Sequence, residues 1–308
     1  PFMICSFIMN NLLRFQGKAS FAMVGITVGG LLNIALDPLF IFTLDMGTAG
    51  AALATGLSQF ISFCILLWMC NHQDSCISIS IRKFRPKLAI YREVLYGGIP
   101  SLGRQGIASV ATILMNFMCQ PYGDAAIAAM SIVSRFMFFI NSVIIGFGQG
   151  FQPVCSYCFG AGLYDRVKKA CWFCIRVSTI ILLVLSVISF PAARSIITLF
   201  RRNDPTVIEI GTLALRLQLI TLPLQGAVIM GNMMPQSIGY GFRATLVSTA
   251  RQGIFLIPLL TIMTYTIGLL GIQCAQPLAD IATFILSLFV IRGIFKEFPE
   301  DASSFAAQ

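Results

Sequence analysis

The sequence predicts an all-α integral membrane protein, a two-lobed helical bundle of which about eight complete helices and one partial helix are present. Of the 308 residues, 57% are hydrophobic and 11% are charged, and the mean hydropathy is +0.85. Soluble domains average about 45–50% apolar and about 25% charged residues. Apolar runs of about 20 residues recur along the chain, and each is long enough to cross the hydrocarbon core of a bilayer.

The apolar runs, with the turn and charge signals between them, give the helices in order. The opening segment 1–13 has no basic n-region and no small-residue cleavage site, so it is interpreted as part of a helix and not as a signal peptide. Complete spans are predicted at 19–44, 48–70, 93–119, 124–158, 168–192, 206–235, 241–267 and 270–295.

The net charge of +9 is concentrated on alternate connections, which predicts that these connections are cytoplasmic. Contact with anionic lipid headgroups accounts for this charge, so no nucleic-acid partner is expected. The opposite side has chiefly Arg201 and Arg202. The predicted cytoplasmic basic residues are Arg14, Lys18, Arg82, Lys83, Arg85, Lys87, Arg92, Arg166, Lys168, Lys169, Arg243, Arg292 and Lys296.

Asp37 lies inside the first complete span, which is otherwise fit only for lipid. An ionised Asp costs roughly 2.5–3.5 kcal/mol at the centre of a membrane helix, so Asp37 is expected to face a polar cavity, take up a proton or bind a cation. Asn33 lies four residues earlier on the same helical face and can share that ion or bond the carboxylate. Pro38 is expected to kink the helix near Ile34 and free carbonyl groups beside Asp37. The alternative is a purely structural bond to a neighbouring helix.

The chain also contains an internal repeat, which is typical of transporters built from duplicated halves. The segment 10–22, NNLLRFQGKASFA, matches the segment 232–244, NMMPQSIGYGFRA, at an offset of 222. Each copy leads into a helix with one proline, Pro38 or Pro258. Further on, GTAGAALA at 47–54 matches GLLGIQCA at 268–275, at an offset of 221. The order and spacing of these matches predict a parallel duplication.

The repeat divides the chain into predicted domains. Residues 1–72 are expected to be the closing part of a first lobe, 73–92 a cytoplasmic linker, 93–295 a complete second lobe of six helices and 296–308 a cytoplasmic tail. By this reading an intact protein would have two lobes of six helices. We therefore expect the first lobe to be incomplete in this chain and the chain alone not to transport.

Five stretches of the sequence carry a resemblance to the multidrug and toxic-compound extrusion (MATE) transporters, and within them to bacterial multidrug export proteins. The resemblance implies twelve helices around a cavity that opens alternately to either side of the cell membrane, a bacterial inner membrane. It further implies a monomer that exports amphipathic, often cationic small molecules in exchange for H+ or Na+, with no cofactor. The stretches are NNLLRFQGKASFAM at 10–23, NIALDPLFIF at 33–42, GGIPSLGRQG at 97–106, GFGQGFQPVCSYCFGAGLYDRVKKA at 146–170 and GNMMPQSIG at 231–239.

The resemblance assigns Asp37 and Asn33 to a first-lobe cation site, although the family's other first-lobe acid would lie on a helix that this chain does not contain. Some family members use acids of the second lobe, but here Glu209 lies near a helix end and Asp280 is judged weakly placed, so coupling is expected in the first lobe. Cavity-lining candidates are the amides within second-lobe spans, for which helix-to-helix hydrogen bonding is the alternative role. These amides are Gln105, Asn116, Asn141, Gln149, Gln152, Gln218 and Gln225.

Arginine, cysteine, glycine and histidine residues elsewhere in the chain could suggest other kinds of site. The arginines within spans are expected to bond carbonyls or acids, to reach the headgroups or, in the case of Arg135, to orient substrates. Cys155, Cys158, Cys171 and Cys174 have zinc-ribbon spacing but lie at the ends of apolar helices, so no metal is expected. Gly146, Gly148 and Gly150 lack the strand and the lysine of a phosphate loop. His72 is the single histidine of the chain and can form neither a catalytic triad nor a metal set. Neither an enzyme nor an ATP-driven pump is therefore expected. The intramembrane arginines are Arg104, Arg135, Arg176, Arg216 and Arg251.

Two other functions stay open at this stage. A lipid-linked oligosaccharide flippase of the same superfamily would share the two-lobed plan, but it would need a strongly cationic cavity. An inert truncated membrane protein would share the composition without transporting anything. Neither the drug nor the choice between H+ and Na+ can be inferred from the residues alone.

Overall fold

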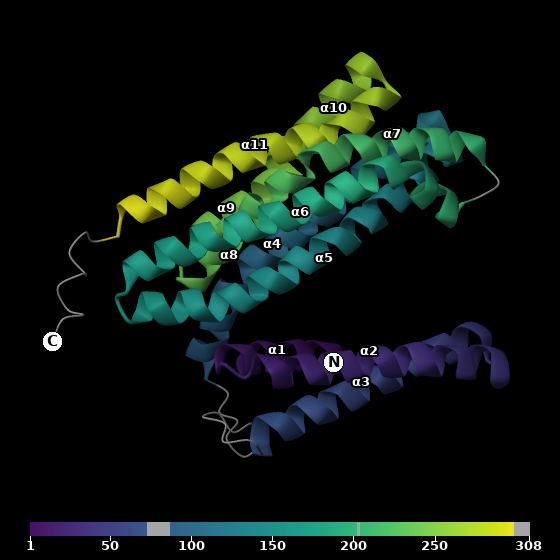
Figure 1. Ribbon diagram of the computed structural model, residues 1–308. Helices are drawn as coiled ribbons and strands as arrows, with labels where there is room; N and C mark the ends of the chain where they lie inside the picture. The colour runs from purple at the N-terminus through teal and green to yellow at the C-terminus, as the bar shows by residue number, and fades with distance from the viewer. Residues whose placement is uncertain (73–86, 202–203, 299–308) are drawn as a thin grey trace. The chain divides into compact units, whose positions relative to one another are not determined.

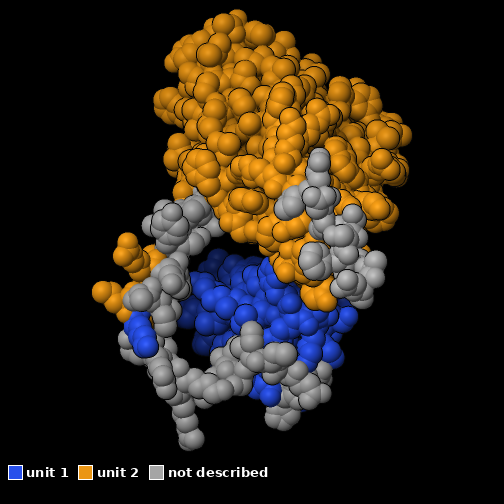
Figure 2. Space-filling model, turned by 90° about the vertical axis from the view of Figure 1, so that its left-hand side faces the viewer, with its two compact units in different colours: residues 1–87 blue, residues 88–308 orange. Residues whose placement is uncertain are grey.

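A computed structural model describes residues 1–72, 87–201 and 204–298, and over these ranges every regular element is a helix. The chain forms two compact units, residues 1–87 and residues 88–308 (Figure 2). Helix α4 begins at Leu88, so residues 88–92, which were predicted to belong to the linker, are helical. Residues 73–86 of the predicted linker and 299–308 of the predicted tail lie outside the described residues.

In unit 1 the α-helices α1, α2 and α3 all pack on one another, as Figure 1 shows. Its core joins Met9 and Leu13 of α1 to Ala22 of α2 and to Leu66 and Cys70 of α3. The elements are α1 (Phe2–Phe15), α2 (Ala19–Pro38), the π-helix η1 (Leu39–Thr43) and α3 (Gly47–His72).

Unit 2 is built around long helices that run side by side, with α5 and α6 as neighbours (Figure 1). The elements are α4 (Leu88–Cys119), η3 (Gln120–Tyr122), α5 (Asp124–Gly160), α6 (Tyr164–Phe200), α7 (Pro205–Thr221), η4 (Leu222–Leu224), α8 (Gln225–Ser237), α9 (Gly241–Thr249), the π-helix η5 (Ala250–Phe255), α10 (Leu256–Ile267) and α11 (Leu269–Lys296). Local sequence sets some of these boundaries. Asp204 Oδ1 accepts a hydrogen bond from Val207 N, and Pro205 occupies the first helical position, as is usual at a helix start.

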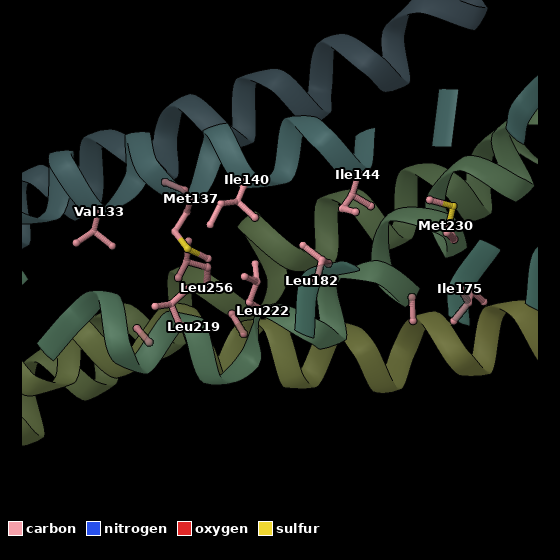
Figure 3. Close-up of a cluster of buried hydrophobic side chains, with 14 of the residues drawn as sticks. Val133, Met137, Ile140, Ile144, Ile175, Leu182, Leu219, Leu222, Met230 and Leu256 are labelled. Carbon is pink, nitrogen blue, oxygen red and sulfur yellow. The ribbon is translucent and has the colours of Figure 1, made fainter. Parts of the chain in front are cut away.

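The core of unit 2 is a continuous layer of aliphatic and methionine side chains. Figure 3 shows Val133, Met137, Ile140 and Ile144 extending from α5 toward side chains of the neighbouring helices. Gly148, on the same helix, allows close packing, because a Cβ there would lie 2.3 Å from Met233 Sδ. Close helix contact at small residues is the usual way in which membrane helices associate.

Among the described residues, seven helical segments are long and apolar enough to cross a membrane. They coincide with seven of the eight predicted spans, and α4 covers the eighth, 93–119. Only 17–44% of the most apolar window of each segment is buried within the protein, so most of this apolar surface faces lipid. The segments are Ala19–Thr43, Gly47–Asn71, Asp124–Gly160, Tyr164–Phe200, Pro205–Ser237, Gly241–Ile267 and Leu269–Lys296.

The internal repeat has a counterpart in individual hydrogen bonds. Asn10 Nδ2 donates to the carbonyl of Ala22 at 2.8 Å, and Asn232 Nδ2 donates to the carbonyl of Ala244 at 3.2 Å. Two backbone bonds are matched as well. Lys18 N donates to Leu13 O and Tyr240 N to Pro235 O, both at 2.9 Å, and the preceding glycines, Gly17 and Gly239, have φ of 79° and 89°.

A helical irregularity follows Pro38. Helix α2 is α-helical through Pro38, and π-helical geometry follows at Leu39–Thr43. The kink near Ile34 stays a prediction. In unit 2 the π-helix η5 precedes Pro258 and contains Ile254, whose carbonyl would be the α-helical partner of residue 258. Proline cannot supply that N–H, and a π-turn accommodates the loss.

Candidate functional site

Asn33 and Asp37 form a polar pair on α2 of unit 1. Both side chains are half-buried, and Asn33 Nδ2 donates to Asp37 Oδ1 at 3.3 Å. The same Nδ2 lies 3.4 Å from Thr55 Oγ1 of α3, which itself donates to the carbonyl of Ala51 at 2.9 Å. Asp37 takes part in none of the ion pairs among the described residues. The pair therefore leaves Asp37 with oxygen capacity for a proton or a cation.

A cavity of about 270 Å³ lies within unit 1 beside this pair. Its walls come from α1, α2 and α3 and combine apolar side chains with hydroxyl and amide groups. Ser6 Oγ, one of the lining groups, is buried without a hydrogen-bond partner. The lining residues are Met3, Ser6, Phe7, Ile26, Gly29, Gly30, Asn33, Thr55, Ser58, Gln59 and Ser62.

Unit 2 contains a different polar centre, a buried network around Asp280 of α11. Asp280 is 1% exposed, and three nitrogens donate to its carboxylate. Arg251 Nε of η5 donates to Oδ1 at 2.8 Å, and Gln225 Nε2 of α8 donates to Oδ2 at 2.7 Å. Gln276 Nε2, one turn earlier on α11, lies 3.3 Å from Oδ1. A buried carboxylate needs such bonds and a counterion, and Arg251 supplies the positive charge.

The predicted cavity-lining amides differ in their exposure. Gln218 and Gln225 are buried, Asn141, Gln149 and Gln152 are half-buried, and Gln105 and Asn116 are exposed. Gln152 Nε2 donates to Gln236 Oε1 at 3.3 Å, which fits the alternative role of joining helices.

The other charged and sulfur groups are spread through unit 2. Arg216 lies over the Phe190 ring at 5.5 Å, and with Arg194 and Glu209 it lines a separate cavity of about 760 Å³. Arg135 and Arg176 are exposed, and the side chain of Arg104 lies outside the described residues. The four cysteines with zinc-ribbon spacing are free thiols. In the described ranges, no cluster of three or more His, Cys, Asp or Glu side chains is placed to hold a metal ion.

The MatE family profile matches residues 100–270, which is more than half of the chain. The chain belongs to the MatE family. The family expected from the sequence is therefore confirmed, and so is the all-α membrane fold.

Individual MatE relatives extend the match to nearly all of the chain. Multidrug export protein MepA of Staphylococcus haemolyticus is 28% identical over 304 residues, which are 99% of this chain and 67% of that protein. The crystal structure of a MATE protein in complex with MaL6 has a TM-score of 0.88 at 25% identity and covers 96% of this chain and 67% of its own. An outward-facing multidrug resistance MATE transporter of the MOP superfamily has a TM-score of 0.86 at 26% identity, covering 95% and 66%. The chain thus spans about two thirds of these relatives.

Asp280, which was judged weakly placed for coupling, is the centre of a buried network in this MatE protein. It is the acid with the most side-chain donors among the described residues, and it is almost completely buried. The sequence does contain a signal, since Asp280 stands inside a long apolar run, the same criterion that selected Asp37. Its partners could not be found in this way, because Gln225 and Arg251 are 55 and 29 residues distant.

Proposed function

We propose that this MatE protein, at its native length, is a secondary multidrug exporter that exchanges amphipathic, cationic small molecules for H+ or Na+. The observation that carries the proposal is the similarity over 99% of the chain to a protein named as a multidrug export protein. The relatives are named as exporters and transporters, not as enzymes. The chain is a multi-pass membrane protein, which suits export across the cell membrane.

The polar pair of unit 1 is the coupling site that we propose. Asp37 can take a proton or, together with Asn33 Oδ1, provide oxygens to a sodium ion. Its position four residues from Asn33 keeps both groups on one helical face, and the 3.3 Å contact between them supports a shared role. The adjacent cavity of about 270 Å³, with its apolar and hydroxyl-bearing walls, suits part of an amphipathic ligand. We further propose that the protein acts as a monomer and needs no cofactor.

Ethidium uptake into everted vesicles, in which the cytoplasmic face is outside, tests this proposal with the protein at its native length. A pH gradient and a sodium gradient are imposed separately, so the coupling ion is read directly. Asp37→Asn should reduce gradient-driven uptake to the rate of vesicles without the protein, because a neutral amide can neither exchange a proton nor balance a cation. Asp45→Asn is the matched control, since Asp45 is exposed and its φ of 48° is one that asparagine adopts readily.

Two results would count against the proposal. If the wild-type protein moved ethidium under neither gradient, drug:cation antiport would be rejected and a flippase or an inert protein would have to be considered. If Asp37→Asn retained wild-type coupling at equal expression, Asp37 would be structural.

A further inference from the structure

The Asp280 network has properties that a purely structural ion pair does not require. Gln225 is 1% exposed, and its Oε1 is buried without a hydrogen-bond partner although its Nε2 bonds Asp280. An unpaired buried acceptor is costly, so its presence beside a carboxylate indicates a place where a further donor can bind. Turning the amide by 180° exchanges its oxygen and nitrogen without changing its shape. The oxygen would then face Asp280, which is favourable only if Asp280 carries a proton.

Arg251 and Asp280 differ in their exposure. The side chain of Arg251 is 25% exposed, whereas that of Asp280 is 1% exposed. The guanidinium therefore has room to move away from the pair, but the carboxylate cannot follow it. A carboxylate left alone in the membrane interior must be neutralised. A proton is the smallest group that does this.

The backbone that carries Arg251 offers a means of moving it. Arg251 is the second residue of the π-helix η5, and short π-helical segments within α-helices are frequent at functional sites. Conversion of such a segment to α-helical geometry shifts the register by one residue, which turns a side chain by about 100° around the helix axis. A turn of that size would take Arg251 Nε out of its 2.8 Å contact with Asp280.

We propose that Asp280 is a second proton-binding site of the transport cycle, at which a proton and the Arg251 guanidinium alternate as the partner of the carboxylate. The amide of Gln225 donates to the ionised carboxylate and, when turned, accepts from the carboxylic acid. A proton suits this centre better than a metal ion, because the three contacts around Asp280 are N–H donors that would repel a cation. The role in transport rests on the proposed function, whereas the exchange itself does not.

Other charged and titratable groups lie on the elements packed against α11, namely α4, α7, α8, α9, α10, η4 and η5. Within the described side chains of these elements, Arg251 is the charged group that forms an ion pair with Asp280. Arg243 of α9 is paired with Glu297 instead, and Glu209 and Arg216 of α7 line the separate cavity. The side chains of Glu93, Tyr96 and Arg104 on α4 lie outside the described residues. The remaining titratable groups on α4, α10 and α11 are Tyr91, Arg92, Cys119, Tyr265, Cys274, Arg292 and Lys296.

Infrared difference spectroscopy of the native-length protein in lipid tests the exchange without any transport measurement. In the Arg251→Gln protein, a carboxylic-acid C=O band should be present at neutral pH, because Asp280 has lost its counterion. The band should be absent from Arg251→Gln/Asp280→Asn, which assigns it to Asp280. Arg216→Gln is the matched control, since Arg216 contacts Phe190 and the separate cavity, and it should show no new band.

Absence of the band in Arg251→Gln, or its persistence in the double variant, would overturn the proposal. If Arg251→Gln does not fold, the folded yield becomes the measurement. The proposal requires the double variant to recover that yield, because it removes both charges, and failure to recover it would be contrary to the proposal.

The role in the cycle is measured by the number of protons taken up per ethidium exported. Asp280→Asn should lower that number by about half if Asp37 and Asp280 each carry one proton. An unchanged ratio would overturn the assignment of Asp280 to the cycle. If the wild type transports no ethidium, the function proposed above fails, while the infrared result still decides whether Asp280 exchanges its partner.

Discussion

Unit 1 and the last third of unit 2 share a pattern of turns but fill the space between their helices differently. Five buried residues mark the packed face of α3: Gly50, Ala54, Ser58, Ser62 and Leu66. The residues 221 positions later on α11 are also buried, and they are Gly271, Ala275, Ala279, Thr283 and Ser287. The same pattern of buried positions therefore occurs twice.

The polar groups of the two units are not the same. At offsets of 221 and 222, Asp280 corresponds to Gln59 or Ser58, Arg251 to Gly30 or Gly29, and Gln225 to Ile4 or Met3. All of these unit 1 residues except Ile4 line the cavity of about 270 Å³. Unit 2 thus places an ion pair and an amide where unit 1 has uncharged side chains and open space. Backbone hydrogen bonds at the turns tolerate many side chains. The side chains between the helices instead determine whether that space is a cavity or a charged centre.

Loss of the buried counterion should have the largest effect and should separate the two units most clearly. Arg251→Gln leaves Asp280 buried and unpaired, so the free energy of unfolding should fall by about 3–5 kcal/mol at neutral pH. Asp37→Asn in unit 1 should change it by about 0–1 kcal/mol, because Asp37 is half-buried and its hydrogen bond comes from the neutral amide of Asn33. Thermal melting of the purified variants measures both. Equal losses would remove the distinction between the two sites.

The glycines at matched positions of the repeat should come next. A Cβ on Gly271 would lie 2.0 Å from Met263 O, and one on Gly50 would lie 2.7 Å from Phe40 O. Because backbone atoms cannot easily move aside, Gly271→Ala should cost about 1–3 kcal/mol or more and Gly50→Ala somewhat less. Gly293→Ala is the control, since nothing lies within 4 Å of its Cβ position, and its melting temperature should not fall. A neutral Gly271→Ala variant would show that these shared buried positions are loosely packed.

The paired asparagine bonds should give smaller and similar effects. Asn10→Ala and Asn232→Ala each remove a hydrogen bond to the following helix, worth about 1 kcal/mol. The loss should be greater for Asn10, which is 7% exposed, than for the half-buried Asn232. Asn11→Ala serves as control, because Asn11 is exposed and bonds a carbonyl of its own helix. A loss at one site alone would mean that the repeated bond stabilises one unit and not the other.

The smallest effect on stability should come from the exposed ion pair of Arg243 with Glu297. Glu297 lies directly after the end of α11. A hydrogen bond from Arg243, together with its charge, lowers the pKa of the Glu297 carboxyl below its usual range. A lowered folded pKa contributes stability above the ordinary pKa of Glu and loses it as the pH falls through the lowered value. Glu297→Gln should therefore melt slightly below the wild type at neutral pH and together with it in acid. Phe21 stands at the position of Arg243 in unit 1, so no counterpart is expected there.

Much of this protein could be read from the sequence because the relevant interactions are local. Hydropathy adds up along one helix, so seven of the predicted spans coincide with apolar helical segments of the structure. The contact between Asn33 and Asp37 follows from helical periodicity, since residues four apart share a face. The repeat could be found because Gly17 and Gly239 adopt positive φ at the same turn, which favours glycine in both copies.

Only the tertiary structure decided which polar groups meet across helices. Thr55 contacts Asn33 although the two residues are 22 positions apart in the sequence. Gln225 of α8 and Arg251 of η5 both donate hydrogen bonds to Asp280 of α11. Such contacts depend on how each helix is rotated about its axis and on where the π-turns fall, and neither is fixed by the composition of a single span. For the same reason the sequence predicted neither the π-helix after Pro38 nor the partners of Asp280. A carboxylate in an apolar run shows that a partner is required, but helix packing determines which residue that partner is.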